Sequence, residues 1–162
     1  MKKSLNLISA VAVILSLIAV SCNQADLEKT ATAQEEAIES FLKNKYQDST
    51  IVNNGGVNRV VLIKGEGAEA AAGDSVFFKF QEGIFNNGNI TTICEGEYAS
   101  VLGNKSMIQG LDKGITGMKK EESSMIIFSA RYGYYDSKVS VVPSMSALVY
   151  YVYLQDIKKS KK

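Results

Sequence analysis

Clusters of β-branched and aromatic residues recur along the chain after residue 56 and predict a series of β-strands. Such residues are typical of strands because their side chains pack well on a pleated surface. In the last cluster, Leu148, Tyr150, Val152 and Leu154 alternate with Val149, Tyr151, Tyr153 and Gln155, as in a strand with two different faces. The predicted strands are Val57 to Lys64, Asp74 to Phe85, Ser124 to Ala130 and Ala147 to Ile157.

Two turn signals accompany these strands. Asn53-Asn54-Gly55-Gly56 comes directly before the first strand, and Asn86-Asn87-Gly88 separates the second strand from a Thr/Ile-rich segment. Asn-Gly pairs adopt positive φ easily, which tight hairpin turns require. The second signal therefore predicts a β-hairpin, and residues 65–73 are predicted to form a loop.

Two other segments follow the helical period. From Thr32 to Tyr46 one side carries Ile38, Phe41, Leu42 and Lys45/Tyr46, and the acidic and lysine residues suit the two ends of the helix dipole. Met107 to Gly114 is predicted as a short helix with Ile108, Leu111 and Ile115 on one side. Because strands dominate, the predicted fold class is α+β, with an antiparallel sheet, one short helix and a preceding N-terminal helix.

The N-terminus has the pattern of a secretory signal. Lys2 and Lys3 precede an apolar run from Leu5 to Val20, which is shorter than the ~20 residues that span a bilayer as a helix. The run ends in LIAVSC at 17–22, which resembles a bacterial lipobox in which Cys22 is lipidated. A plain signal peptide with an incidental cysteine, or a transmembrane anchor, are the alternatives.

The lipobox resemblance implies a cellular location and a division of the chain into segments. Three acyl chains on Cys22 would anchor the protein stably to a membrane, so we expect a location in the cell envelope, outside the cytoplasm. The predicted divisions are a lipoprotein signal peptide (1–21), a lipidated tether and amphipathic helix (22–56), a folded domain (57–158) and a basic tail (159–162). The tail is predicted to be solvated and frayed, with contact to anionic lipid as the alternative.

Composition excludes several kinds of chemistry. The 162 residues contain no His, no Trp and two Cys, which leaves no imidazole base, no His-ligated zinc and no disulfide scaffold. The formal net charge of +1 argues against a nucleic-acid partner. We therefore expect no cofactor and no metal, and a protein that binds, or that catalyses without ionising side chains.

Several segments in a fixed order resemble a known domain. They are GDSV at 73–76, VLGNKSMIQGLDKGITGM at 101–118, FSARYGY at 128–134, and VVP at 141–143 before the strand ALVYYVYL at 147–154. This string is similar to the FKBP-type (macrolide-binding) peptidyl-prolyl isomerase domain, over about residues 57 to 157. The resemblance implies a twisted antiparallel sheet wrapped around the short helix, and clients that contain proline.

The resemblance also assigns site residues. It implies that the Ile108 backbone N–H and the Tyr134 hydroxyl bind the substrate carbonyl or amide, as the catalytic pair. It implies a substrate pocket lined by Phe80, Tyr98, Met107, Leu111, Val142 and Tyr150. Each of the apolar residues, taken alone, is more often part of an ordinary sheet core than of a ligand-binding wall, so the order of the motifs is what supports the site.

The chain departs from the family pattern inside this pocket. Leu111 stands where the family has a floor Trp, and Ile93-Cys94 stand at the place of a Phe-Asp pair. Glu121 replaces a Gly, and Ser129 replaces a Pro. The sequence thus predicts a weak prolyl isomerase that assists the folding of exported proteins. The alternatives are a catalytically silent module that binds a peptide or protein partner, and a purely structural envelope lipoprotein.

Overall fold

The computed structural model describes the backbone of residues 2–161 and the side chains of residues 24–161. The predicted signal peptide and the Cys22 side chain therefore lie outside the described side chains. Within the described part of the chain, no helix has the length and apolar character needed to cross a membrane. The elements, in chain order, are α1 (Lys2–Lys45), β1 (Thr50–Asn54), β2 (Val57–Ile63), β3 (Ser75–Asn86), β4 (Asn89–Val101), α2 (Gln109–Ile115), β5 (Ser123–Phe128), the 3₁₀ turn η1 (Ala130–Tyr132) and β6 (Ala147–Lys158).

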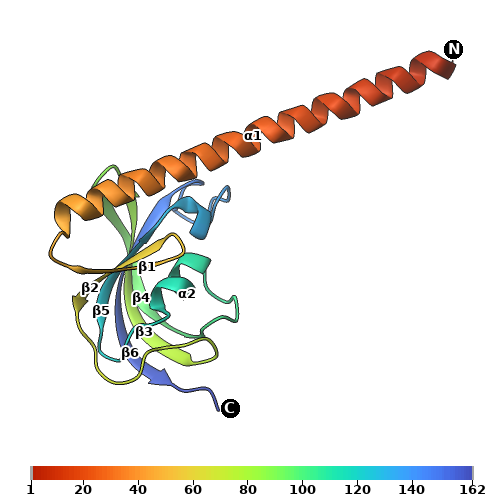
Figure 1. Ribbon diagram of the computed structural model, residues 1–162. Coiled ribbons are helices and arrows are strands. Elements are labelled where there is room, and N and C mark those ends of the chain that lie inside the picture. The colour runs from red at the N-terminus through yellow and green to blue at the C-terminus, as the bar shows by residue number, and fades with distance from the viewer. Residues whose placement is uncertain (1, 162) are drawn as a thin grey trace.

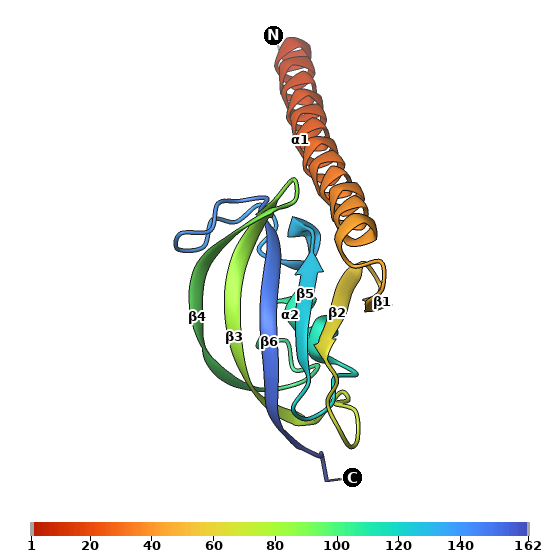
Figure 2. The ribbon, with the colours of Figure 1, turned by 90° about the vertical axis from the view of Figure 1, so that its left-hand side faces the viewer.

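Six strands form one twisted antiparallel sheet in the order β1-β2-β5-β6-β3-β4 (Figures 1 and 2). The β3–β4 hairpin closes where the sequence predicts it, with Asn86 opposite Asn89 and Gly88 at φ 88°. The C-terminal strand β6 lies between β3 and β5, so the last strand of the chain occupies the centre of the sheet. The α+β class and the sheet around a short helix are confirmed.

Helix α2 packs closely on one face of the sheet because two glycines face it. A Cβ atom at Gly110 would collide with the Phe128 ring, and one at Gly114 would collide with Ile126, both on β5. Around this contact, the largest apolar cluster combines Leu111 and Ile115 of α2 with inward side chains of the strands. Side chains of a strand alternate between faces, so the apolar residues at alternate positions of β3, β5 and β6 belong to this cluster.

The opposite face of the sheet is covered by the C-terminal part of α1. Ile38 and Leu42 are buried there against Met125, Ile127 and other apolar strand residues. The predicted helical face is therefore confirmed, although α1 extends further toward the N-terminus than the predicted Thr32 to Tyr46. Away from the sheet, α1 projects well beyond the domain (Figures 1 and 2).

The remaining boundaries agree with prediction to within about two residues, with two exceptions. Strand β1 was not predicted, since all five of its residues are exposed and show no apolar alternation. The predicted strand from Ser124 to Ala130 is too long, because the chain leaves the sheet after Phe128 and turns into η1.

The start of the basic tail is held in place. Lys159 donates to the Asp74 carboxylate (2.8 Å) and to the Glu69 carbonyl, and the Ser160 N–H donates to Asp74 (3.0 Å). Both residues are exposed, as a solvated tail requires, but the prediction that the tail is frayed is wrong for them.

Candidate active site

A hollow of about 290 Å³ opens on the α2 face, between the start of α2 and the strands β3, β4 and β6. Seven of the predicted site residues line it together: Phe80, Tyr98, Met107, Ile108, Leu111, Tyr134 and Tyr150. Phe78, Glu82 and Ser106 complete the lining. The wall is thus mostly apolar and aromatic, with a few polar groups among the rings.

The aromatic rings form a connected wall. The Tyr150 ring stacks on Phe128 with their centroids 6.0 Å apart, and it lies 5.9 Å from the Phe80 ring. Phe78 connects this pair to Tyr98, with ring centroids 6.1 Å apart. Strands β3 and β6 pair directly, with Phe80 opposite Val152 and Glu82 opposite Tyr150. The ring positions are therefore fixed by the register of the sheet.

Ile108 occupies the residue before the first turn of α2. Its backbone is extended (φ −60°, ψ 146°), and its carbonyl accepts hydrogen bonds from the N–H groups of Leu111 and Asp112, both at 3.1 Å. The N–H groups at the start of a helix have no partner within the helix. The Ile108 N–H is therefore a donor that α2 itself does not use, at the edge of the hollow.

Tyr134 reaches the hollow from the β5–β6 connection, and helix α1 holds that connection. Gln34 of α1 accepts from the Ala130 N–H (2.9 Å) and donates to the Met145 carbonyl (2.6 Å). Glu35 accepts hydrogen bonds from Ser129 and Arg131 at 2.9 and 3.1 Å. Polar contacts from α1 thus fix both ends of the loop that carries Tyr134.

One acid lies inside the hollow. Glu82 is buried, with 7% of its surface exposed, and its Oε2 accepts a hydrogen bond from the Cys94 thiol at 3.2 Å. Cys94 lies directly opposite Glu82 in the β3–β4 ladder. The sequence predicts an acid-free pocket, since the expected position of a family carboxylate holds Cys94. That expectation is wrong, because the neighbouring strand supplies a carboxylate instead.

The hydroxyls of Tyr134 and Tyr150 and the thiol of Cys94, all close to Glu82, have raised pKa values. Burial, together with the nearby Glu82 carboxylate, raises the pKa of the Tyr134 hydroxyl and raises that of Tyr150 far above its usual range. Partial burial and the hydrogen bond to Glu82 also raise the pKa of the Cys94 thiol. These groups therefore remain protonated at neutral pH, and the two phenols act as hydrogen-bond donors rather than bases.

Comparison with known proteins identifies the family. The family model of the FKBP-type peptidyl-prolyl cis-trans isomerase matches residues 66–155. The chain belongs to the FKBP-type isomerase family. Among curated relatives, the FK506-binding protein 1 of Aspergillus oryzae is 25% identical over 114 residues, which are 63% of this chain and 98% of the relative. That of Gibberella zeae is 26% identical over 109 residues, with the same coverage.

Solved structures share the fold of this FKBP-type chain. FkpA from Escherichia coli superposes with a TM-score of 0.65 at 20% identity, covering 92% of this chain and 73% of that one. The structure of three FKBP domains of wheat FKBP73 superposes with a TM-score of 0.60 at 22% identity. The match covers 69% of this chain and half of the wheat chain.

One predicted pocket residue of this FKBP-type domain lies elsewhere. Val142 does not line the hollow; it is buried, with 4% of its surface exposed, in the apolar cluster on the α2 face. It belongs to the long β5–β6 connection. In such a loop, a motif match gives the order of the residues but does not show which side chains point into the hollow. Val142 is therefore a packing residue, and its exposed neighbour Val141 does not replace it in the hollow.

Of the unpredicted pocket residues, Glu82 had a usable signal. Val76, Phe78, Phe80 and Glu82 follow each other at every second position of β3, so the strand period places Glu82 on the inner face. A charged residue at an inward position is exceptional, and that mismatch could have indicated a site. Ser106 had no such signal, because it lies in the loop before α2.

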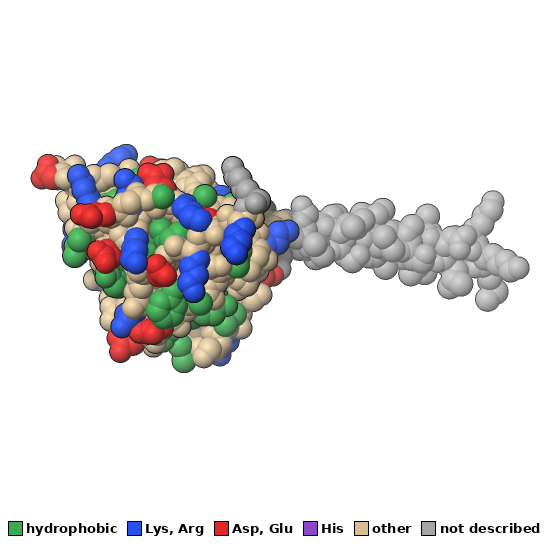
Figure 3. Space-filling model, turned by 90° about the horizontal axis from the view of Figure 1, so that it is seen from below, with side chains coloured by type: hydrophobic (Ala, Val, Ile, Leu, Met, Phe, Trp, Pro, Cys, Tyr) green, Lys and Arg blue, Asp and Glu red, His purple; other side chains and the backbone are tan. Residues whose placement is uncertain are grey.

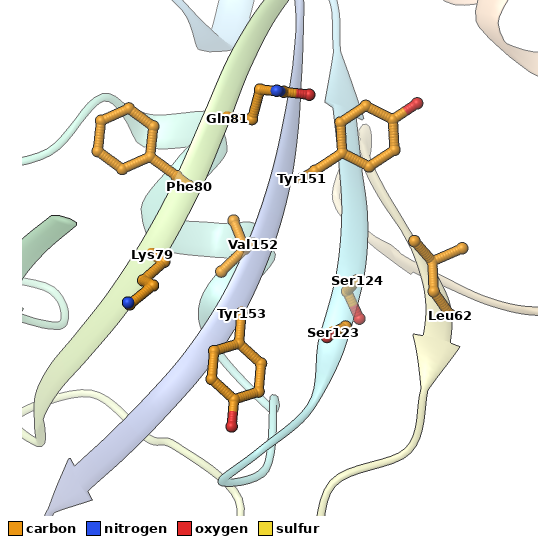
Figure 4. Close-up of a pocket in the computed structure, with 9 residues that line it drawn as sticks. All are labelled: Leu62, Lys79, Phe80, Gln81, Ser123, Ser124, Tyr151, Val152 and Tyr153. Atoms are coloured by element: carbon orange, nitrogen blue, oxygen red, sulfur yellow. The ribbon is translucent and has the colours of Figure 1, made fainter. Parts of the chain in front are cut away.

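A second hollow lies on the other face of the sheet (Figure 4). Figure 4 shows Leu62, Tyr151 and Tyr153 spread over β2 and β6 without converging on one point. Leu62 and Tyr153 are exposed, and the Lys79 side chain is paired with Glu97 at 2.9 Å. In the view of Figure 3, basic and acidic side chains are mixed with apolar ones. The hollow beside α2 remains the candidate active site.

Proposed function

We propose that this chain is a weak peptidyl-prolyl cis-trans isomerase that assists the folding of exported proteins. The observation that supports this most directly is the hollow beside α2, in which seven predicted site residues converge, five of them from three separate segments of the family motif. An X-Pro bond isomerises over a barrier of ~18–20 kcal/mol without any proton transfer. An apolar wall with well-placed donors is therefore chemically sufficient.

The proposed mechanism uses differential binding of the twisted peptide. The aromatic rings receive the prolyl ring and remove water from the amide, which weakens the hydrogen bonds that favour its planar form. The Ile108 N–H binds the substrate carbonyl, and the Tyr134 hydroxyl donates a second hydrogen bond. Donors that fit the twisted geometry better than the planar one lower the barrier. The smaller Leu111 in place of a Trp floor leaves the prolyl ring less tightly held, which supports weak activity.

Replacing Ile108 by proline tests the backbone donor. Proline has no N–H and fixes φ near −65°, close to the −60° observed, so the change removes the donor with little change in backbone. We expect kcat/KM for an Xaa-Pro peptide to fall at least ~10-fold, since a donor of this kind is worth roughly that much or more. The measurement is a protease-coupled assay on the full chain in detergent micelles.

Ile108→Val is the matched control, because it shortens the side chain but keeps the N–H. We expect its kcat/KM within about threefold of the parent, with unchanged melting temperatures for both variants. Because the Tyr134 pKa is raised, we also expect kcat/KM to stay flat between about pH 6 and 9. If the parent chain and Ile108→Pro are both indistinguishable from buffer, the chain is instead a non-catalytic binding module.

The proposed address is the cell envelope, with Cys22 as the lipid-bearing residue. The support is the short apolar run after Lys2 and Lys3 that ends at a lipobox-like cysteine. Labelling with radioactive palmitate should mark the chain in a bacterial host, and Cys22→Ser should lose the label and leave the membrane fraction. A Cys94→Ser control should keep the label. Equal labelling of parent and Cys22→Ser would reject this site.

A further inference from the structure

One oxygen of the acid in the hollow has no partner. Glu82 Oε2 accepts from the Cys94 thiol. The Tyr150 hydroxyl lies close enough to the carboxylate for the pKa of Tyr150 to be raised by it, but Oε1 is buried and makes no hydrogen bond of good geometry within the described residues. Buried polar atoms in folded proteins are nearly always hydrogen-bonded. An unpaired carboxylate oxygen in a cleft therefore points to a ligand that donates to it.

The surroundings leave the charge of Glu82 without a counter-ion. Aromatic and aliphatic side chains with Ser106 form the rest of the lining, and no Lys or Arg is among the described lining residues. The buried cation of the α2 face, Arg59, is paired with Glu122 instead, at 3.4 Å. Hence the protein itself supplies no cation at this end of the hollow.

A prolyl ring alone does not satisfy this oxygen. The nitrogen of an Xaa-Pro bond carries no hydrogen, and the ring carbons are apolar. Glu82 as a whole is 7% exposed, and covering it with such a ring would remove this last contact with water without supplying a donor to the carboxylate, which is unfavourable. A ligand with a positively charged nitrogen beside the ring reverses the sign of this effect.

We propose that the hollow prefers prolyl segments that carry a cationic nitrogen next to the ring, with Glu82 as the counter-ion. The neighbouring rings of Phe80 and Tyr150 support the same preference, because aromatic faces attract cations. The nitrogen can come from a Lys or Arg before the proline, or from the secondary ammonium of an N-terminal proline. This inference rests on the proposed function for its turnover measurement, but not for its binding measurement.

The test compares peptides that differ only in charge. Acetyl-Ala-Lys-Pro-Phe-amide is matched with its norleucine analogue, which has a similar chain without the ammonium group. A second pair, Pro-Ala-Phe-amide with a free or acetylated N-terminus, separates the ring nitrogen from the side-chain source. Isomerisation of the Lys-Pro and norleucine-Pro bonds is measured by exchange NMR, and binding of all four peptides by chemical-shift titration, with the full chain in micelles. In at least one of the two pairs, we expect the cationic peptide to bind about tenfold more tightly than its neutral partner, and that pair shows which nitrogen Glu82 recognises.

Variants of Glu82 assign the preference. Glu82→Gln keeps the shape but removes the charge, and Glu82→Leu removes both oxygens; in each, the two members of a pair should bind within about twofold. Glu95→Gln is the matched control. Glu95 is exposed next to Cys94 on β4, so this substitution removes the same charge outside the hollow. It should keep the tenfold preference.

The outcomes separate this inference from the proposed function. Equal binding of cationic and neutral members by the parent chain overturns the inference and leaves isomerisation standing. A cationic preference that disappears in Glu82→Gln, without acceleration of any peptide, supports the inference and rejects catalysis. A preference that survives in both Glu82 variants overturns the role of Glu82.

Discussion

Helix α2 and the C-terminal part of helix α1 cover opposite faces of the same sheet, and both faces carry aromatic side chains. Under α1 the rings close on each other: Phe41 lies edge-on to Phe85 at 5.2 Å and to Tyr46 at 5.8 Å. Under α2 the rings of Phe80 and Tyr150 line an open hollow instead. Apolar composition alone therefore does not distinguish a core from a binding site.

Buried charge is what separates the two faces. The cluster under α1 consists of apolar residues, whereas the α2 face also holds Glu82 and the buried pair Arg59–Glu122, which lie among apolar neighbours. Charged groups are seldom buried, because water solvates them better than a protein interior. Arg59 has Glu122 as its counter-ion and donates to the Gly117 carbonyl, although its Nε and Nη1 make no hydrogen bond in the described part of the chain. Glu82 has no Lys or Arg among the described lining residues. The pair is therefore structural, and the charge of Glu82 is available to a ligand.

The largest expected effect comes from breaking the structural pair. Arg59→Met should lower the free energy of unfolding by about 3–5 kcal/mol, because Glu122 is left as an unpaired buried charge. Urea unfolding followed by circular dichroism measures the change. Since Arg59 does not line the hollow, peptide turnover by the molecules that remain folded should not change.

The double variant Arg59→Met/Glu122→Gln is the control for this effect. It removes both charges and should be more stable than Arg59→Met alone, although Glu122 also accepts hydrogen bonds from the Lys119 N–H and Ser124. A loss below about 1 kcal/mol for Arg59→Met would show that the pair is not buried in solution, and would remove the proposed distinction between the two faces.

On the closed face, Ile38→Ala should lower the free energy of unfolding by about 2–4 kcal/mol. Ile38 is 1% exposed, and the truncation leaves a cavity between α1 and the strands. The same urea measurement applies, with the exposed Glu39→Ala on the same helix as control, expected within about 0.5 kcal/mol. A change near zero for Ile38→Ala would mean that α1 does not dock on this face in solution.

How much of this arrangement the sequence could predict depends on the kind of signal. The strands β3, β5 and β6 and helix α2 follow from clear periodicity, because each buries one set of side chains. Strand β1 could not be predicted, since only its backbone pairing with β2 makes it a strand. The side chains of β1 show no pattern that would indicate this pairing.

The site was predictable as a set of rings but not as a chemical environment. The motif order brought Ile108, Tyr134 and Tyr150 together correctly. The carboxylate was missed because the position that should supply it holds Cys94. The strand period places Glu82 on the inner face of β3, but the register is needed to show that it lies opposite Cys94. The hold of α1 on the Tyr134 loop depends on contacts about 100 residues apart in sequence, which no local pattern encodes.

The hydrogen bonds from α1 to the Tyr134 loop connect the two faces, and removing them should cost less stability than the two changes above. Gln34→Ala removes the hydrogen bonds to the Ala130 N–H and the Met145 carbonyl, so the free energy of unfolding should fall by about 1–2 kcal/mol. We also expect KM for an Xaa-Pro peptide to rise while Ile38→Ala leaves it unchanged, because Gln34 hydrogen-bonds to the loop that carries Tyr134 whereas Ile38 packs on the sheet.

Glu36→Ala, on the exposed side of the same helix, is the control for the Gln34 variant and should change neither quantity. If Gln34→Ala and Ile38→Ala raise KM equally, loss of the helix as a whole explains both, and the hydrogen bonds to the loop have no separate role.

The last prediction concerns Asp74, which connects the loop before β3 to the C-terminal residues Lys159 and Ser160. Lys159, the Ser160 N–H and the Ala71 N–H lower the pKa of Asp74 to about 2. A lowered pKa means that the ionised acid stabilises the folded state above its ordinary pKa of about 4, and that this contribution disappears as the pH falls from about 4 toward 2. Asp74→Asn should therefore have a lower urea midpoint than the parent at pH 7, and the two midpoints should converge near pH 2.

Asp156→Asn provides the matched comparison for the Asp74 experiment. Asp156 pairs with Lys120 at the surface (3.1 Å), and its pKa is also lowered, by the hydrogen bond and charge of Lys120. Its one backbone donor is the N–H of the adjacent Ile157 on the same strand, and no loop is held through it. Its difference from the parent should therefore be smaller and should shrink in 1 M NaCl, as for an exposed pair. If Asp74→Asn loses its difference in salt to the same degree, then Asp74 acts only through the charge of Lys159. The N–H groups of Ala71 and Ser160 would then contribute nothing measurable to stability.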